Sequence, residues 1–120
     1  MLPKKNRANK KSIEKIFKEG RFVSSPNLTF KFINNTIPST PQISFIVPKT
    51  TSKKAVVRNL LRRRGYAVLQ KYFKTIPPST LGAFVFGKKG EKIFGVRKNK
   101  ENNPIQNLEN EIKTILNKLH

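Results

Sequence analysis

Residues 53–74, KKAVVRNLLRRRGYAVLQKYFK, carry eight basic side chains and no acidic one. If this stretch is helical, turning about 100° per residue, one of its sides carries an apolar stripe that can pack against a sheet. The stripe consists of Val57, Leu61, Val68 and Tyr72. Gly65 interrupts the pattern at a cost of about 1 kcal/mol relative to alanine, which indicates either close packing there or a bend. The stretch therefore predicts a helix that anchors in the core and displays cations.

The cations of this helix include an arc that suits phosphate. Arg58, Asn59 and Arg62 lie beside the apolar stripe, and the small Ala55 between them lets the backbone lie close to a bound partner. Arginine offers a planar fork of donors that matches phosphate oxygens, and asparagine adds a donor and an acceptor for ribose or base edges. The alternative is that the basic run is only a solvated helix face. The absence of carboxylates within the run favours binding.

The composition favours one small domain with a polyanionic partner. A chain of 120 residues, 36% of them hydrophobic and nine of them phenylalanine, can form a modest core of two layers. The formal net charge of +20 makes the compact state repel itself. Such charge is normally tolerated when a polyanion neutralises it, so nucleic acid is the expected partner.

Several other classes of protein are disfavoured. No stretch approaches the roughly 18 apolar residues of a membrane span, and the best apolar runs, ISFIV and LGAFVF, are typical of strands. The basic N-terminus is not followed by an apolar segment, so we expect neither a signal peptide nor an anchor. The chain has no cysteine, which excludes disulfides and thiolate metal sites. We therefore expect a cytoplasmic protein.

The first third of the chain predicts a basic arm and a short helix. Residues 1–11 carry five cations without an apolar period, so we expect a flexible arm that orders on a charged partner, or else a plain solubilising tail. Ser12 can cap a helix that runs through Glu19 and stops at Gly20. Its apolar residues, which share one side, are Ile13, Ile16 and Phe17. A helix this short must dock on a sheet.

Strand patterns follow this helix. Residues 22–23 can start a short strand, and residues 28–32 alternate between apolar and polar side chains, as in a half-buried strand. Residues 43–47, ISFIV, form a run rich in β-branched and aromatic residues, typical of a central strand. We expect the strands at 28–32 and 43–47 to be antiparallel neighbours.

The second half of the chain predicts a crossover and a closing helix. The KTTS of residues 49–52 can cap the long helix, which should run until Pro77-Pro78. Residues 81–86 return as a buried strand, parallel to the previous one, and such connections are normally right-handed. Residues 87–100 predict a loop or a ragged hairpin. Residues 104–119 form an amphipathic helix that starts at Pro104. Half of the six acidic residues lie in or beside it, namely Glu101, Glu109 and Glu111, so we expect the polyanion to bind away from the outer face of this helix.

The inventory of side chains argues against catalysis by this chain alone. It has no aspartate or cysteine, and its only histidine is the last residue. The spacings of Glu14 with Glu19 and of Glu109 with Glu111 place neither pair on one helix face, which argues against the converging carboxylates that a metal-dependent protein nuclease needs. A pair of histidines for acid and base catalysis is impossible. We therefore predict no catalytic residue, and whether any residue meets a metal stays unknown.

A set of motifs matches a known family. They are KKNR near the start, IEKIFKEG, RFVSSPNLTF, ISFIVPK and, above all, KKAVVRN followed by LLRRR. In order and spacing these motifs resemble the protein subunit of bacterial ribonuclease P over most of the chain, although residues 87–103 match poorly. The resemblance implies an α+β fold, a single-domain two-layer sandwich of order αβββαβα, with helices packed on a mixed sheet. It also implies a left-handed crossover, where the general rule predicts a right-handed one.

The resemblance further implies a division of labour. In that family the RNA subunit cuts precursor tRNA to free the mature 5′ end, while the protein binds the catalytic RNA and the 5′ leader and assists metal-dependent catalysis. Mg²⁺ is expected to be held mainly by RNA. No organic cofactor, membrane or obligate protein partner is implied.

Two sets of site residues follow from the resemblance. The set that binds the catalytic RNA is Lys53, Lys54, Ala55, Val56, Arg58, Asn59, Arg62, Arg63 and Arg64. The set that binds the leader, in a cleft between the first helix and the sheet, is Phe17, Phe30, Lys31, Lys10 and Arg7. An aromatic side chain can stack an unpaired base for about 1–3 kcal/mol. For Phe17, a place in the core is an equally good interpretation.

The chain departs from the family pattern at Leu60, where the second arginine of an Arg-Asn-Arg motif is expected, and at Ile13, where an aromatic is common. Two other function classes stay open. One is a structural RNA-binding protein of the ribosomal type, which shares this charge and layout. The other is a protein-only nuclease, which would cleave RNA without an RNA subunit.

Overall fold

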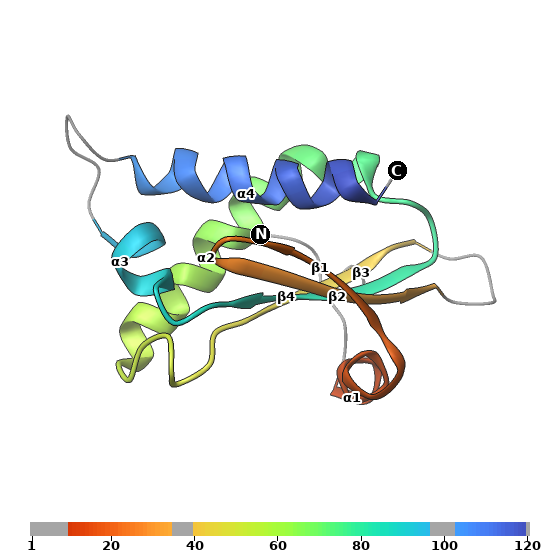
Figure 1. Cartoon of the computed structure of the whole chain (residues 1–120), viewed down its shortest axis with the longest axis horizontal. Helices are drawn as coiled ribbons and strands as arrows, with labels where there is room; N and C mark the ends of the chain where they lie inside the picture. The colour runs from red at the N-terminus through yellow and green to blue at the C-terminus, as the bar shows by residue number, and fades with distance from the viewer. Residues whose placement is uncertain (1–9, 35–39, 97–102, 120) are drawn as a thin grey trace.

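Four strands form one mixed sheet in the computed structural model, which describes residues 10–34, 40–96 and 103–119 (Figure 1). The spatial order is β1-β2-β4-β3. The strands are β1 (Arg21–Ser25), β2 (Leu28–Asn34), β3 (Gln42–Ile46) and β4 (Thr80–Phe86). β1 with β2 and β2 with β4 are antiparallel, whereas β3 and β4 are parallel. The structure thus confirms the short strand at Phe22 and the parallel pair across the long helix.

The expectation that the strands at 28–32 and 43–47 are neighbours is wrong, because β4 lies between β2 and β3. Six of the seven residues of β4 are buried. A strand covered on both faces is best placed in the middle of a sheet, and β4 is the most continuously apolar of the described strands. The hand of the connection from β3 through the long helix to β4 stays a prediction.

Helices cover the two faces of the sheet unequally (Figure 1). The long helix α2 (Ala55–Tyr72) and the closing helix α4 (Pro104–Lys118) share the larger core with one face. Helix α1 (Lys10–Glu19) packs on the opposite face, where Ile16 and Leu81 form a small second cluster. The α+β architecture of helices on a mixed sheet is therefore confirmed.

Several predicted boundaries are corrected. Helix α1 begins at Lys10, inside the predicted arm, and the rest of that arm lies outside the described residues. Helix α2 is capped by Lys54 without a side-chain hydrogen bond, rather than by the preceding KTTS, and it passes into a 3₁₀ turn at Phe73–Thr75 before the prolines. Residues 87–100 are not a hairpin where they are described, because they contain the short helix α3 (Gly90–Phe94).

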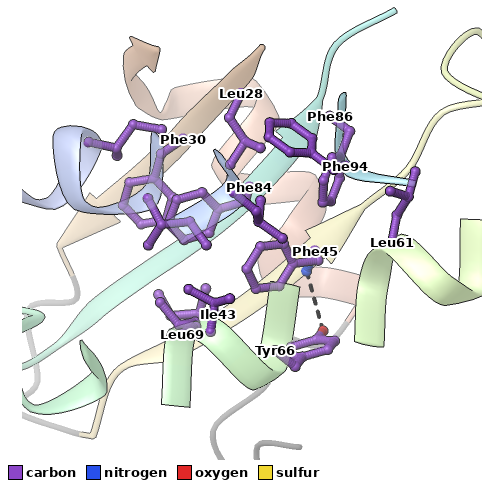
Figure 2. Packing of buried hydrophobic residues seen from close by; sticks show 14 of the residues in the cluster. Leu28, Phe30, Ile43, Phe45, Leu61, Tyr66, Leu69, Phe84, Phe86 and Phe94 are labelled. Carbon is purple, nitrogen blue, oxygen red and sulfur yellow. Dashed lines mark hydrogen bonds between the residues drawn. The ribbon is translucent and has the colours of Figure 1, made fainter. Parts of the chain in front are cut away.

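The core packing beside α2, where Phe45 meets Tyr66 (Figure 2), explains why this helix contains a glycine. Phe45 on β3 stacks against Phe84 on β4, with ring centroids 4.9 Å apart and planes 12° apart. The Tyr66 ring of α2 meets Phe45 edge-on at 5.0 Å, and its hydroxyl accepts a hydrogen bond from the Phe45 N–H at 3.3 Å. A Cβ on Gly65 would lie 2.6 Å from two Phe45 ring carbons. Close packing, not a bend, therefore accounts for Gly65.

The closing helix α4 starts as predicted, with the Asn103 side chain accepting from the Gln106 N–H and Pro104 in the first turn. Its carboxylates tie it to the rest of the fold. Glu111 accepts from the Ser25 hydroxyl at 2.6 Å, and from the Asn27 N–H and side-chain amide at 2.7 and 3.0 Å. These bonds fix the turn between β1 and β2. The Glu111 carboxylate of α4 is thus engaged in hydrogen bonds within the protein.

Candidate nucleic-acid interface

The N-terminal half of α2 and the residues before it form a cationic surface. Six of the nine predicted residues are exposed: Lys53, Lys54, Ala55, Val56, Asn59 and Arg63. Val56 is 78% exposed, which is unusual for a valine. Within the described part of the chain the only ion pair is Lys71 with Glu109, at the other end of α2. The cations of this surface are therefore not neutralised by described carboxylates.

Arg58 and Arg62 lie half-buried along this surface and are held in place by oxygen atoms of the protein. Arg58 Nη1 donates to the carbonyls of Ser52 at 3.0 Å and Lys53 at 2.9 Å. Arg62 Nη2 donates to Asn59 Oδ1 at 2.7 Å. A guanidinium has five N–H donors, so both groups keep donors for a partner. The geometry brings Arg58, Asn59 and Arg62 together on one arc, ordered before any partner arrives.

Arg64 has a different place from the other arginines of the run. Its Nη1 donates to the carbonyl of Phe94 at 2.6 Å and to that of Val96 at 2.9 Å, so it binds the C-terminal end of α3. Partial burial lowers the pKa of Arg64 from its ordinary value, but arginine stays charged. These bonds give Arg64 a structural task on α3, and its assignment to the RNA-binding set stays a prediction.

A second candidate surface lies where α1 meets the sheet. The Lys31 ammonium sits 4.7 Å from the centroid of the Phe17 ring, within the range of a cation–π contact. Phe17 is 42% exposed, so its ring is not enclosed in the core. The predicted pair of Phe17 and Lys31 therefore shares one site.

Phe30 does not belong to this surface, which corrects its assignment to the leader set. Successive side chains of a strand point to opposite faces, so Phe30 and Lys31 cannot share one. Phe30 is fully buried, with its ring centroid 4.5 Å from that of Phe84 and 5.5 Å from that of Phe32. It is a core residue and offers no face to a base.

Phe22 is the aromatic residue that the sequence interpretation missed. It lies directly opposite Lys31 in the pairing of β1 with β2, so both side chains are on the face that carries Phe17. It is 69% exposed. The sequence did contain a signal, because the short Pro26-Asn27 turn sets the register that places Phe22 opposite Lys31.

The remaining predictions on site residues are not resolved by the fold. Arg7 lies outside the described residues, and Lys10 begins α1 without a described side chain. Among the residues that the structure describes, no group of three or more histidine, cysteine, aspartate or glutamate side chains gathers as metal ligands would. Nor is any described helix long and apolar enough to cross a bilayer.

Comparisons with known proteins agree with this fold. The family model described as Ribonuclease P matches residues 2–120. The chain is similar in fold to the RNase P protein from Thermotoga maritima, with a TM-score of 0.77, 18% identity, and coverage of 95% of this chain and 97% of that one. It is also similar to the Staphylococcus aureus RNase P protein, with a TM-score of 0.70, 17% identity, and coverage of 93% and 92%. A comparison with curated proteins finds no match.

Proposed function

Because the chain belongs to the ribonuclease P family, as a protein subunit of that ribonucleoprotein, we propose that it binds both the catalytic RNA and the 5′ leader of precursor tRNA. In this role it assists the RNA-catalysed, metal-dependent removal of the leader that forms the mature 5′ end of tRNA. Family membership sets aside the ribosomal alternative. It also makes the absence of aspartate, cysteine and an internal histidine understandable, since the chemistry would belong to the RNA.

The observation that carries the proposal is the cationic surface at the start of α2. Lys53, Lys54 and Arg63 project there without described carboxylate partners, and Arg58 and Arg62 are held in fixed positions beside them. Preordered guanidinium groups bind phosphate at a lower entropic cost than free ones. Exposed Ala55 and Val56 add a small apolar patch against which a ribose or a base can pack. This surface suits the folded catalytic RNA.

The leader would lie on the other face of the sheet, beside α1. Lys31 contacts the Phe17 ring there and pairs across the strands with Phe22, so two exposed aromatic residues neighbour one cation. Rings stack unpaired bases with little preference for sequence, and the ammonium meets the phosphate that links them. Such a site suits the leaders of many different precursors, which share a backbone and no sequence.

Mg²⁺ would be held mainly by the RNA. The described side chains do not assemble the converging carboxylates of a protein-held metal site, so the donor set does not fit a metal centre made by this chain alone. Bound Mg²⁺ supplies charge neutralisation and a water activated for attack on the scissile phosphate. The part of this protein is to bring the two RNAs together and to reduce phosphate repulsion between them, so that cleavage needs less Mg²⁺.

The decisive experiment reconstitutes the protein with a bacterial ribonuclease P RNA and measures cleavage of precursor tRNA at low Mg²⁺. We expect a clear gain in rate over RNA alone, and no cleavage by the protein alone. Arg63→Ala should weaken RNA binding and reduce the slope of log affinity against log salt by about one unit, since one phosphate contact is lost. Lys113→Ala, which removes an equal charge from the exposed side of α4, is the matched control. An equal effect of both variants, or no gain from the wild-type protein, would contradict the proposal.

A further inference from the structure

Hydrogen bonds join the turn that leads into α2 to the C-terminal end of β4 and to α3. Thr51 and Ser52, each 5% exposed, precede the helix. The Thr51 hydroxyl lies 3.0 Å from the carbonyl oxygen of Phe86 and 2.9 Å from that of Gly87. The Ser52 hydroxyl donates to Glu91 Oε1 at 2.7 Å. The hydroxyls of Thr51 and Ser52 therefore hold in place the turn at which the cationic surface begins.

The same turn is fastened on its other side by residues of the cationic surface. The Lys54 N–H donates to Ser52 Oγ at 3.3 Å. Arg58 donates to the carbonyls of Ser52 and Lys53, as described above. Glu91, Ser52 and Arg58 thus form one continuous chain of hydrogen bonds, with Lys53 and Lys54 between its ends.

Glu91 stands in a place where its charge opposes the binding of a polyanion. Its helix, α3, also carries Lys92 and follows Lys88 and Lys89, all exposed, and Ser52 brings it against the cationic end of α2. None of these lysines forms an ion pair with Glu91 in the described part of the chain. The described contact of its carboxylate is the hydrogen bond that it accepts from Ser52. A bond to a charged acceptor contributes more than a neutral one.

From this arrangement we infer that Glu91 is a positioning residue for RNA binding: through Ser52 it holds Lys53, Lys54 and Arg58 in the arrangement that receives the catalytic RNA. The inference rests on the proposed function of α2. It predicts a paradox, since deleting this negative charge from a protein of charge +20 should weaken its binding to RNA.

The test measures affinity for a bacterial ribonuclease P RNA, and its salt dependence, for the wild-type protein and four variants. Glu91→Ala removes the acceptor, and Ser52→Ala removes the donor. Glu91→Gln keeps an oxygen acceptor for Ser52 without the charge. Glu14→Ala, on the exposed side of α1, is the matched control for the loss of one negative charge.

We expect Glu91→Ala and Ser52→Ala to weaken binding about tenfold, the size of effect typical for a hydrogen bond to a charged group. The double variant should be no worse than either single one, because both break one connection. Glu91→Gln should restore most of the affinity, and Glu14→Ala should leave it equal or slightly improved.

Amide NMR spectra of the free variants separate positioning from loss of folding. In Glu91→Ala, shifts confined to residues 51–58 and 86–92 would support positioning. Tight RNA binding by the wild-type protein together with unchanged or improved binding by Glu91→Ala would overturn the inference and leave the proposed function intact. Weak binding by the wild-type protein would instead count against the proposed function. If Glu91→Ala unfolds, unchanged affinity in a folded Ser52→Ala overturns the inference in its place.

Discussion

Gly65→Ala tests how closely α2 is seated on the sheet, because two opposing effects decide its sign. Alanine in place of glycine within a helix stabilises it by about 1 kcal/mol. Against this, the new Cβ would lie 2.6 Å from the Cδ1 and Cε1 atoms of Phe45 and 3.0 Å from its Cγ. Overpacking of this kind costs about 1–3 kcal/mol in a core that cannot adjust.

The surroundings of Phe45 favour the upper part of that range. The ring is 3% exposed and stacks on Phe84, with the Phe86 ring 6.0 Å away and Tyr66 against its edge. It has nowhere to move without disturbing another aromatic residue. We therefore expect Gly65→Ala to lower the free energy of unfolding by about 1–2 kcal/mol, and the melting temperature by several degrees.

Urea and thermal unfolding measure this effect, and Ala67→Gly is the matched control. Ala67 is exposed on the same helix two residues further on, so its replacement reports helix propensity alone, with a loss of about 1 kcal/mol. A Gly65→Ala protein more stable than wild type would refute the close contact between α2 and β3. It would mean that α2 sits further from the sheet, and with it the cations on its outer side.

Three further changes probe other parts of the fold. Glu111→Ala removes the acceptor of three hydrogen bonds from Ser25 and Asn27, so urea unfolding should show a loss of about 2–3 kcal/mol, whereas Glu14→Ala should change little. Phe22→Ala should weaken binding of precursor tRNA by about 1–3 kcal/mol, while binding of mature tRNA and the free energy of unfolding stay unchanged. Phe30→Ala should instead lower the free energy of unfolding by about 3–5 kcal/mol. The hydrogen bond that Tyr72 donates to Glu109 raises the pKa of Tyr72 above 10.0. The unfolded state then releases this proton first, so stability falls as pH rises above about 10, and Tyr72→Phe should flatten that part of the profile in urea unfolding at several pH values.

Periodicity predicted what depends on one element at a time. The apolar stripe of α2 is confirmed, because Leu61 and Val68 are buried and Val57 and Tyr72 pack beside them. The start of α4 at Pro104 followed from local capping chemistry. These features need only the spacing of side chains along one helix.

The features that the sequence interpretation missed depend on which helices and strands contact one another in the folded protein. The place of β4 between β2 and β3 is a property of the whole sheet, and no pattern within β2 or β3 contains it. The turn of Arg64 toward the carbonyls of Phe94 and Val96 required the position of α3. Phe30 and Lys31 were both assigned to the leader set as residues of the strand that lines the groove, although strand alternation already separates these neighbours.

The alternation of β2 divides its residues between two tasks that can change independently. Leu28 and Phe30 are sealed in the interior, while Thr29 and Lys31 face outward beside their β1 partners Ser24 and Phe22. A combinatorial library restricted to these four outward positions would vary the proposed leader-binding face and leave the packing of Leu28 and Phe30 untouched. Natural substitutions at these positions are equally independent of the core, and the same positions are available for engineering such a protein to bind new single-stranded ligands.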